Sequence, residues 1–212
     1  NFGCQQSPID FLKARAFQTP DLEVQVTWTR LSLSYAHDRK FQVAQADGHL
    51  ELDGEPYVPV DLHWHLPAEH TEGDLRHPAE VHIVHVHAED VEMAGKGELD
   101  WLRIAVVGVF IEQGDARYEP FAAILDVKPA EGEEKKVVAI GRSDILPTEA
   151  LAYRYCGGLT TPPYSENVTF VILRAPRTAT AEQLRDGGAP NARPLQDVNR
   201  RVVAIGDVGG LD

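Results

Sequence analysis

Residues 61–87 read DLHWHLPAEHTEGDLRHPAEVHIVHVH, a histidine-rich stretch in which two strand-like runs flank a glycine-containing turn. His63 and His65 are separated by one residue. Side chains on a β-strand alternate between faces, so both imidazoles point to the same side. In the second run Glu80 and His82 share a face by the same alternation. The stretch therefore predicts a hairpin that directs three imidazoles toward one ion.

The donor set of this hairpin favours catalytic zinc. Three neutral imidazoles with an open fourth position are typical of catalytic Zn²⁺, whereas structural sites are usually closed by cysteine thiolates. Glu80 stands two residues before His82, and Asp61 two residues before His63, so each carboxylate can hold a ligand ring through its second nitrogen. A His-x-His pair alone is more often a core or surface feature. The third histidine beside an acidic partner is what favours the metal site.

Length and charge limit the classes of protein that this chain can represent. At 212 residues we expect one domain spanning 1–212. No apolar run is long enough to predict a membrane span. A formal net charge of -13 argues against a nucleic-acid partner, because neutralising phosphates requires clustered lysines and arginines. The chain begins without Met, which we interpret as a processed or trimmed product.

The hydrophobic pattern predicts a mainly β (α+β) architecture. A near-continuous apolar run at 101–111 is typical of a strand covered on both faces. Helical spacing predicts short helices at 118–130 and 179–188, the second beginning after Thr180. Further strands are expected where apolar and polar residues alternate between short turns, at 22–36, 41–45, 49–54 and 57–65.

The chain resembles the α-class carbonic anhydrases over nearly its whole length. The motifs that carry the resemblance occur in that family's order and approximate spacing: QSPID at 6–10, HWH, AEHT and EVHIVH within 63–85, LTTPP at 159–163, and NARP at 191–194. The resemblance implies one large, twisted, mostly antiparallel sheet with zinc in a central cleft. It implies a zinc lyase that reversibly hydrates carbon dioxide to bicarbonate and a proton, by attack of zinc-bound hydroxide.

Carried over residue by residue, the resemblance implies His63, His65 and His82 as zinc ligands. Thr160 matches the gatekeeper threonine, and Glu69 matches its carboxylate partner. A threonine that donates its only hydroxyl proton to a carboxylate can only accept from the zinc-bound hydroxide, and it thereby orients that nucleophile.

Further residues match family positions that support the ligands or line the substrate wall. Asn191, in the NARP motif, matches a supporting position, and Thr161 matches a second polar wall position in contact with bicarbonate. Carbon dioxide is apolar and requires an apolar wall beside the metal. Phe170 stands where the family usually has Trp. The matching wall residues, each of which also fits an ordinary core position, are Val84, Val106, Leu159, Val168 and Phe170.

The remaining histidines receive other assignments. His70 and His85 match positions that are buried and hydrogen-bonded in the family, so both are predicted to be structural. His77 and His87 are predicted to be surface groups. His49 has no discernible role.

The proton exit departs from the family pattern. A histidine of pKa near 6.5 is suited to relay the proton. Aligning FQV at 41–43 with the family's matching strand places Arg39 at the usual shuttle position, and arginine remains protonated. His37, expected two residues earlier on the same strand face, is the candidate substitute. We therefore expect slower, more buffer-dependent turnover than in members with the usual histidine.

The beginning of the chain also departs from the family. The sequence begins without the aromatic segment that usually precedes the QSPID motif, which means that either the protein lacks this segment or the chain was trimmed. Secreted members often join the two regions that contain Cys4 and Cys156 by a disulfide, which predicts that these cysteines pair. Such a bond implies an oxidising compartment, so the expected location is secreted, periplasmic or extracellular.

Two other functions remain open on the sequence. The first is a non-catalytic carbonic-anhydrase-like binding or storage protein. The second is a generic zinc hydrolase with Glu69 as general base. The expected partners are carbon dioxide and bicarbonate, with sulfonamides and anions as inhibitors, and a homodimer is left open.

Overall fold

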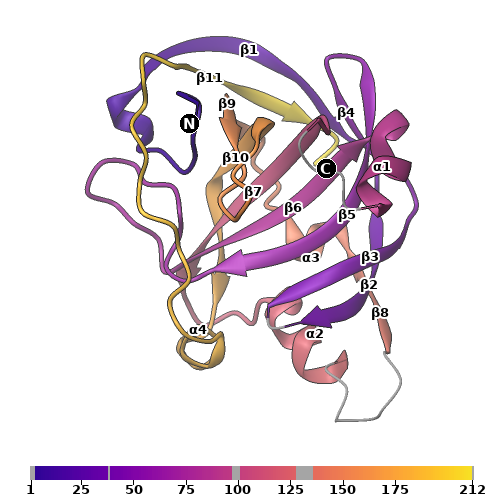
Figure 1. Cartoon of the computed structure of the whole chain (residues 1–212). Coiled ribbons are helices and arrows are strands. Elements are labelled where there is room, and N and C mark those ends of the chain that lie inside the picture. The colour runs from indigo at the N-terminus through magenta and orange to yellow at the C-terminus, as the bar shows by residue number, and fades with distance from the viewer. Residues whose placement is uncertain (1–2, 38, 97–100, 128–135, 212) are drawn as a thin grey trace.

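A computed structural model describes residues 3–37, 39–96, 101–127 and 136–211. In the described residues, eleven strands form one sheet in the order β4-β1-β11-β9-β10-β7-β6-β5-β3-β2-β8 (Figure 1). The strands are β1 (Arg15–Val26), β2 (Arg30–His37), β3 (Lys40–Ala46), β4 (Leu50–Leu52), β5 (Glu55–His65), β6 (Ala79–His87), β7 (Ile104–Gln113), β8 (Val137–Gly141), β9 (Leu151–Gly158), β10 (Glu166–Ala179) and β11 (Val202–Gly209).

Most neighbours in this sheet are antiparallel, as predicted. Only β1 with β11 and β7 with β10 pair in parallel among the described strands. The strand β4 pairs with both β1 and β5, so much of the sheet curls back on itself (Figure 1). This second pairing covers edges that would otherwise present unpaired backbone groups.

The helices are short and lie around the margin of the sheet (Figure 1). The predicted helices are confirmed as α2 (Glu119–Val127) and α4 (Ala181–Asp186), although 128–130 lie outside the described residues. Thr180 closes a capping box at the start of α4, which satisfies backbone N–H groups of the first turn. The remaining helical segments are η1 (Phe11–Lys13), η2 (Ala88–Asp90), α1 (Val91–Gly95) and α3 (Arg142–Ile145).

Two apolar clusters cover the central strands. On β7, Ala105, Val107 and Val109 belong to one cluster, while Ile104 and Val106 belong to the other. This alternation places the clusters on opposite faces and explains why the 101–111 run is apolar almost throughout. No helix in the described ranges is long and apolar enough to cross a bilayer.

The strands β5, β6 and β7 pair side by side in the middle of the sheet order. Their register places His63 directly opposite His82 and places His65 opposite Glu80. The predicted hairpin is therefore confirmed, and its histidines share the face on which a site can form.

Candidate metal centre

Three imidazoles converge where β5 pairs with β6. One ring nitrogen from each of His63, His65 and His82 lies within 4.8 Å of the others. The ring centroids are 4.9 to 5.3 Å apart. Three imidazoles gathered at this spacing are a group that could hold a metal ion.

Carboxylates hold two of the three rings. Asp61 Oδ1 lies 2.7 Å from His63 Nδ1, and Glu80 Oε1 lies 2.8 Å from His82 Nε2. Each carboxylate accepts the ring N–H, which sets the tautomer of the ligand. His63 Nε2 and His82 Nδ1 consequently keep the lone pairs that can bind a metal. Both acidic partners therefore lie where the sequence predicted them.

His65 is buried, and neither of its ring nitrogens bonds a described protein group. Burial, followed by the electrostatic effect of the neighbouring imidazoles of His82 and His63, holds the pKa of His65 well below its ordinary value. The ring is therefore neutral and can donate a lone pair. Asn191 fixes the strand end behind it, since its Oδ1 accepts from Leu66 N at 2.9 Å and its Nδ2 donates to Trp64 O at 3.2 Å.

Glu80 is the centre of a buried network behind His82. Its Oε1 also accepts from His70 Nδ1 at 2.7 Å, and its Oε2 accepts the backbone N–H groups of Glu69 and His70, both at 2.9 Å. Burial favours the neutral acid, but the two histidines and these bonds hold the pKa of Glu80 well below its usual range. Burial lowers the pKa of His82, and the Glu80 carboxylate outweighs this effect, so the net shift is upward.

The network continues from His70 to the start of the chain. His70 Nε2 lies 2.6 Å from Tyr155 Oη, which lies 2.8 Å from Ser7 Oγ. His70 and His85 are buried and hydrogen-bonded, in agreement with their structural assignment. Sequence reasoning missed Tyr155, because no local pattern signals a partner 85 residues away.

Gly108 allows β7 to pack closely behind this network. It pairs with His82, and a Cβ added to it would lie 2.3 Å from Ile172 Cδ1 and 3.3 Å from Glu80 Oε1. A side chain would therefore press on the carboxylate that positions His82. The isolated glycine inside an apolar strand run is the signal that would have identified this position.

Of the predicted pair of Thr160 and Glu69, Glu69 lies beside His65, and no hydrogen bond joins Glu69 Oε2 to Thr160. Glu69 Oε1 accepts from Arg193 N at 2.9 Å and lies 3.4 Å from His65 Nδ1. Its Oε2 is buried and accepts no hydrogen bond from a described protein group. Thr160 is buried too, whereas Thr161 is exposed. Glu69 Oε2 is therefore free to accept the hydrogen bond that the sequence predicts from the Thr160 hydroxyl.

Arg193, which sequence reasoning missed, connects Glu69 to the loop that contains Thr160. Its guanidinium donates to Ser7 O at 2.7 Å and lies 3.9 Å from the centre of the Tyr164 ring. One residue thus supports Glu69 through its backbone and the loop through its side chain. The NARP motif was its only sequence signal.

The five predicted wall residues belong to one apolar cluster. Val106, Val168 and Phe170 are buried in it, and Val84 and Leu159 pack against it with partial exposure. The Phe170 ring centroid lies 6.0 Å from that of His82. The cluster therefore borders the histidines with an apolar surface.

The two candidates for the proton exit are not on one strand face, so that expectation was wrong. His37 ends β2 and is exposed, whereas Arg39 lies in the turn that leads into β3 and is buried. The strands β2 and β3 form an antiparallel pair in which His37 lies opposite Lys40. Arg39 Nη2 donates to Ala189 O, and its guanidinium fills the space above Gly188, which has a φ of +104°.

His77 and His87 are buried, which corrects their assignment to the surface. His77 stacks on Phe110 at 4.5 Å between ring centroids, and Tyr57 meets His87 edge-on at 5.1 Å. Their imidazoles pack as aromatic rings inside the sheet. The surface assignment was wrong because it considered only the polarity of the histidines. The strand pattern around them does not indicate these ring partners, which belong to other strands.

Cys4 and Cys156 are free and exposed, so the predicted disulfide is absent from the structure. Arg201 donates to Cys156 O at 3.3 Å, and Asn199 Nδ2 donates to Cys4 O at 3.1 Å. The disulfide was inferred from cysteines at different offsets in the family, and similar regions do not guarantee a matching pair of positions. The expected oxidising compartment was inferred from this bond and stays a prediction.

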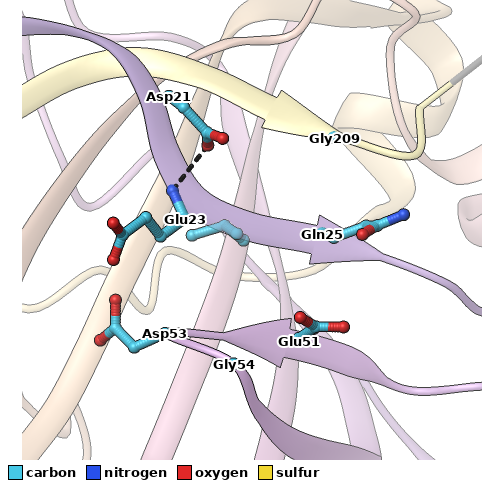
Figure 2. Close-up of a pocket in the computed structure, with 8 residues that line it drawn as sticks. Asp21, Glu23, Gln25, Glu51, Asp53, Gly54 and Gly209 are labelled. Atoms are coloured by element: carbon cyan, nitrogen blue, oxygen red, sulfur yellow. Dashed lines mark hydrogen bonds between the residues drawn. The ribbon is translucent and has the colours of Figure 1, made fainter.

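A separate acidic pocket lies between β1 and β4 (Figure 2). Its carboxylates are Asp21, Glu23, Glu51 and Asp53, and its lining includes none of the three clustered histidines. Asp21 accepts from Glu23 N at 2.7 Å, and Asp53 pairs with Arg154. Its carboxylates would repel the bicarbonate anion that the sequence resemblance implies, so the candidate site is the histidine cluster.

The fold and this site define a class: a large curved β-sheet that holds three imidazoles, two of them fixed by carboxylates, beside an apolar wall. A family model for eukaryotic-type carbonic anhydrase matches residues 2–206. The chain belongs to this carbonic anhydrase family.

Individual relatives agree with the family match. Alpha carbonic anhydrase 7 of Arabidopsis thaliana is 32% identical over 225 residues, which cover 96% of this chain and 74% of the plant protein. The alpha-carbonic anhydrase of Photobacterium profundum superposes with a TM-score of 0.75 at 27% identity, covering 95% of this chain and 89% of that one. That of Thermovibrio ammonificans, solved with the inhibitor sulfanilamide, gives 0.74 at 29% identity, covering 95% and 87%.

The family and these relatives support carbonic anhydrase activity for this chain, that is, the hydration of carbon dioxide in general. Members of the family are zinc enzymes, and the histidine cluster is a group that could hold a metal ion.

Proposed function

We propose that the chain is a zinc-dependent carbonic anhydrase in which His63, His65 and His82 bind the metal. The observation that carries this proposal is the convergence of three ring nitrogens within 4.8 Å, with His63 and His82 each held from behind by a carboxylate. This arrangement presents lone pairs toward a common point and keeps the tautomers fixed.

The residues fit zinc better than other common ions. Imidazole nitrogens are ligands of zinc, whereas Ca²⁺ and Mg²⁺ prefer oxygen donors. No cysteine completes the set among the described residues, so a fourth position is left for a reacting molecule. When bound at such a site, zinc acts as a Lewis acid that provides a water-derived nucleophile near neutral pH.

The protein's own groups would orient the nucleophile. We propose that the Thr160 hydroxyl donates to Glu69 Oε2, which is buried without a described donor. The threonine oxygen can then only accept a hydrogen bond from the nucleophile. This bond turns a lone pair of the nucleophile toward the substrate. Arg193 N holds the other carboxylate oxygen at 2.9 Å and so keeps Glu69 in place.

The apolar cluster would hold the substrate. Carbon dioxide has no net dipole, so Val84, Val106 and Phe170 can accommodate it without removing a hydrogen bond from any polar group. Bicarbonate is charged and gains nothing from such a wall. Thr161, which is exposed beside Thr160, is proposed to contact this product before it leaves.

The deciding experiment combines stopped-flow carbon dioxide hydration with metal analysis of the same sample. We expect fast hydration at about one zinc per chain, inhibited by sulfanilamide. Full zinc occupancy without hydration would refute the enzyme and favour a carbonic-anhydrase-like binding protein. Esterase activity far above carbon dioxide hydration would instead favour a zinc hydrolase. His82→Ala is the matched control, because it removes a proposed ligand and should lose metal and activity together.

A further inference from the structure

Asp61, the carboxylate that accepts from the proposed ligand His63, also contacts a cation. Lys40 Nζ lies 2.8 Å from Asp61 Oδ2, while Asp61 Oδ1 lies 2.7 Å from His63 Nδ1. Lys40 also pairs directly with His63 across β3 and β5. The three side chains thus form a chain of contacts from ammonium to carboxylate to imidazole on the face that holds the histidine cluster.

This arrangement is sheltered enough for its charges to matter. The Asp61 side chain is 13% exposed, and that of Lys40 is 40% exposed. Asp61 Oδ1 faces the imidazole N–H and Oδ2 faces the ammonium, so both oxygens act as acceptors, as a carboxylate anion requires.

The two carboxylates behind the cluster, Glu80 and Asp61, have different kinds of partners. Glu80 is surrounded by two imidazoles and two backbone N–H donors, so its four contacts are all hydrogen bonds from within the network. Among the described residues Asp61 contacts one imidazole, that of His63, and its second partner is Lys40. An anion on the N–H of a ligand imidazole draws the proton toward itself and makes the ring a stronger, more negative donor. A cation on the far oxygen weakens that pull.

We infer that Lys40 is a positioning residue of the metal centre, which neutralises Asp61 and thereby keeps His63 a neutral imidazole ligand. This inference rests on the proposed zinc site. The other titratable groups around His63 are His65 and His82 in the cluster, with Glu69 and Glu80 behind them. None of these four replaces the cation on Asp61, so removing Lys40 leaves a net negative charge beside the metal.

The test uses four variants of the full chain. Lys40→Met removes the cation but retains an unbranched side chain of similar length, and Lys40→Arg preserves the cation. Asp61→Asn keeps an oxygen acceptor for His63 Nδ1 without the charge. The double variant removes both charges. Two quantities are measured for each: the pH at which the hydration rate is half-maximal, and the rate of zinc release to an excess of chelator.

The charge-balancing role predicts opposite shifts. Lys40→Met should raise the half-maximal pH by roughly 0.5 to 1 unit, less than a directly contacting charge produces, and should not speed zinc release. Asp61→Asn should lower the half-maximal pH, because it leaves Lys40 unpaired. The double variant and Lys40→Arg should both return close to the parent value.

Other outcomes overturn the inference. If Lys40→Met speeds zinc release with an unchanged half-maximal pH, Lys40 only holds β3 against β5. If Lys40→Met behaves like the parent in both measurements, the contact has no effect on the site. The parent protein separates this failure from failure of the proposed function: a parent that binds no zinc refutes the metal centre, whereas a zinc-loaded, active parent with unresponsive variants refutes only the role of Lys40.

Discussion

Replacing Glu80 by Gln tests whether the buried carboxylate organises the metal centre. The carboxylate accepts from His70 Nδ1 and His82 Nε2 on Oε1, and from the backbone N–H groups of Glu69 and His70 on Oε2. A carboxamide has one acceptor oxygen and one NH₂ group. Whichever way the new amide is turned, its NH₂ group faces two donors.

The consequence depends on that orientation, but both orientations are unfavourable. If the NH₂ group faces the backbone, two buried N–H groups lose their acceptor. If it faces the imidazoles, His82 must accept at Nε2 and carry its proton on Nδ1, the atom proposed to bind zinc. Two unsatisfied buried donors, at about 1 to 3 kcal/mol each, lower the free energy of unfolding by about 4 kcal/mol. Loss of the carboxylate that orients the proposed ligand His82 is expected to lower the affinity for zinc by roughly 10- to 100-fold.

Urea denaturation of the metal-free protein measures the first quantity, and competition with a zinc chelator measures the second. Glu92→Gln is the control, because Glu92 is 83% exposed and, among the described residues, contacts only Lys96, the C-cap of its helix. We expect this control to change the free energy of unfolding by less than about 0.5 kcal/mol. If Glu80→Gln matches the control in both measurements, the carboxylate does not organise the site.

The same contacts lead to four further expectations. Thr160→Ala should lower the hydration rate roughly 100-fold while zinc content is retained, because it removes orientation and no ligand; zinc loss in step with activity would contradict this role. Gly108→Ala should lower the free energy of unfolding by about 1 to 3 kcal/mol, because the new methyl group would overlap Ile172; an unchanged urea midpoint would show that the strand can shift. Burial lowers the pKa of His85 from 6.5 to about 4, so the unfolded chain binds a proton that the native chain does not. Above about pH 6.5 this group does not lower the free energy of unfolding, and as the pH drops to about 4 it lowers that free energy by about 3 kcal/mol. Urea titrations of His85→Gln should lack this pH dependence. Identical pH dependence in the parent and the variant would exclude His85 as the cause. With Arg39 at the usual shuttle position, turnover should rise with imidazole buffer concentration, and equal rates in weak and concentrated buffer would refute this expectation.

Much of the site could be predicted from local patterns, because strand geometry relates residues two apart. His63 and His65 share a face, as do Glu80 and His82, and the structure places each carboxylate beside its ligand as this periodicity requires. The capping box at Thr180 is likewise a local signal, and α4 begins where it predicts.

The long-range contacts could not be predicted in this way. Lys40 and Asp61 meet only because β3 pairs with β5 in one particular register, and a shift by one residue would turn Lys40 to the other face. Tyr155 reaches His70 across 85 residues, and Arg193 reaches Glu69 across 124 residues. No pattern within either segment encodes the distance to the other.

Burial was also decided by the tertiary structure. His77 and His87 are polar residues near strand ends, and the sequence predicted them to be on the surface. In the structure each is buried and packs against an aromatic ring. The sequence by itself determined the strand-rich architecture and the shared face of the histidine ligands, since both arise from a two-residue repeat. The packing of one strand on another determined which carboxylates are paired, which histidines are buried and that the cysteines are free, because those properties depend on register between segments distant in the chain.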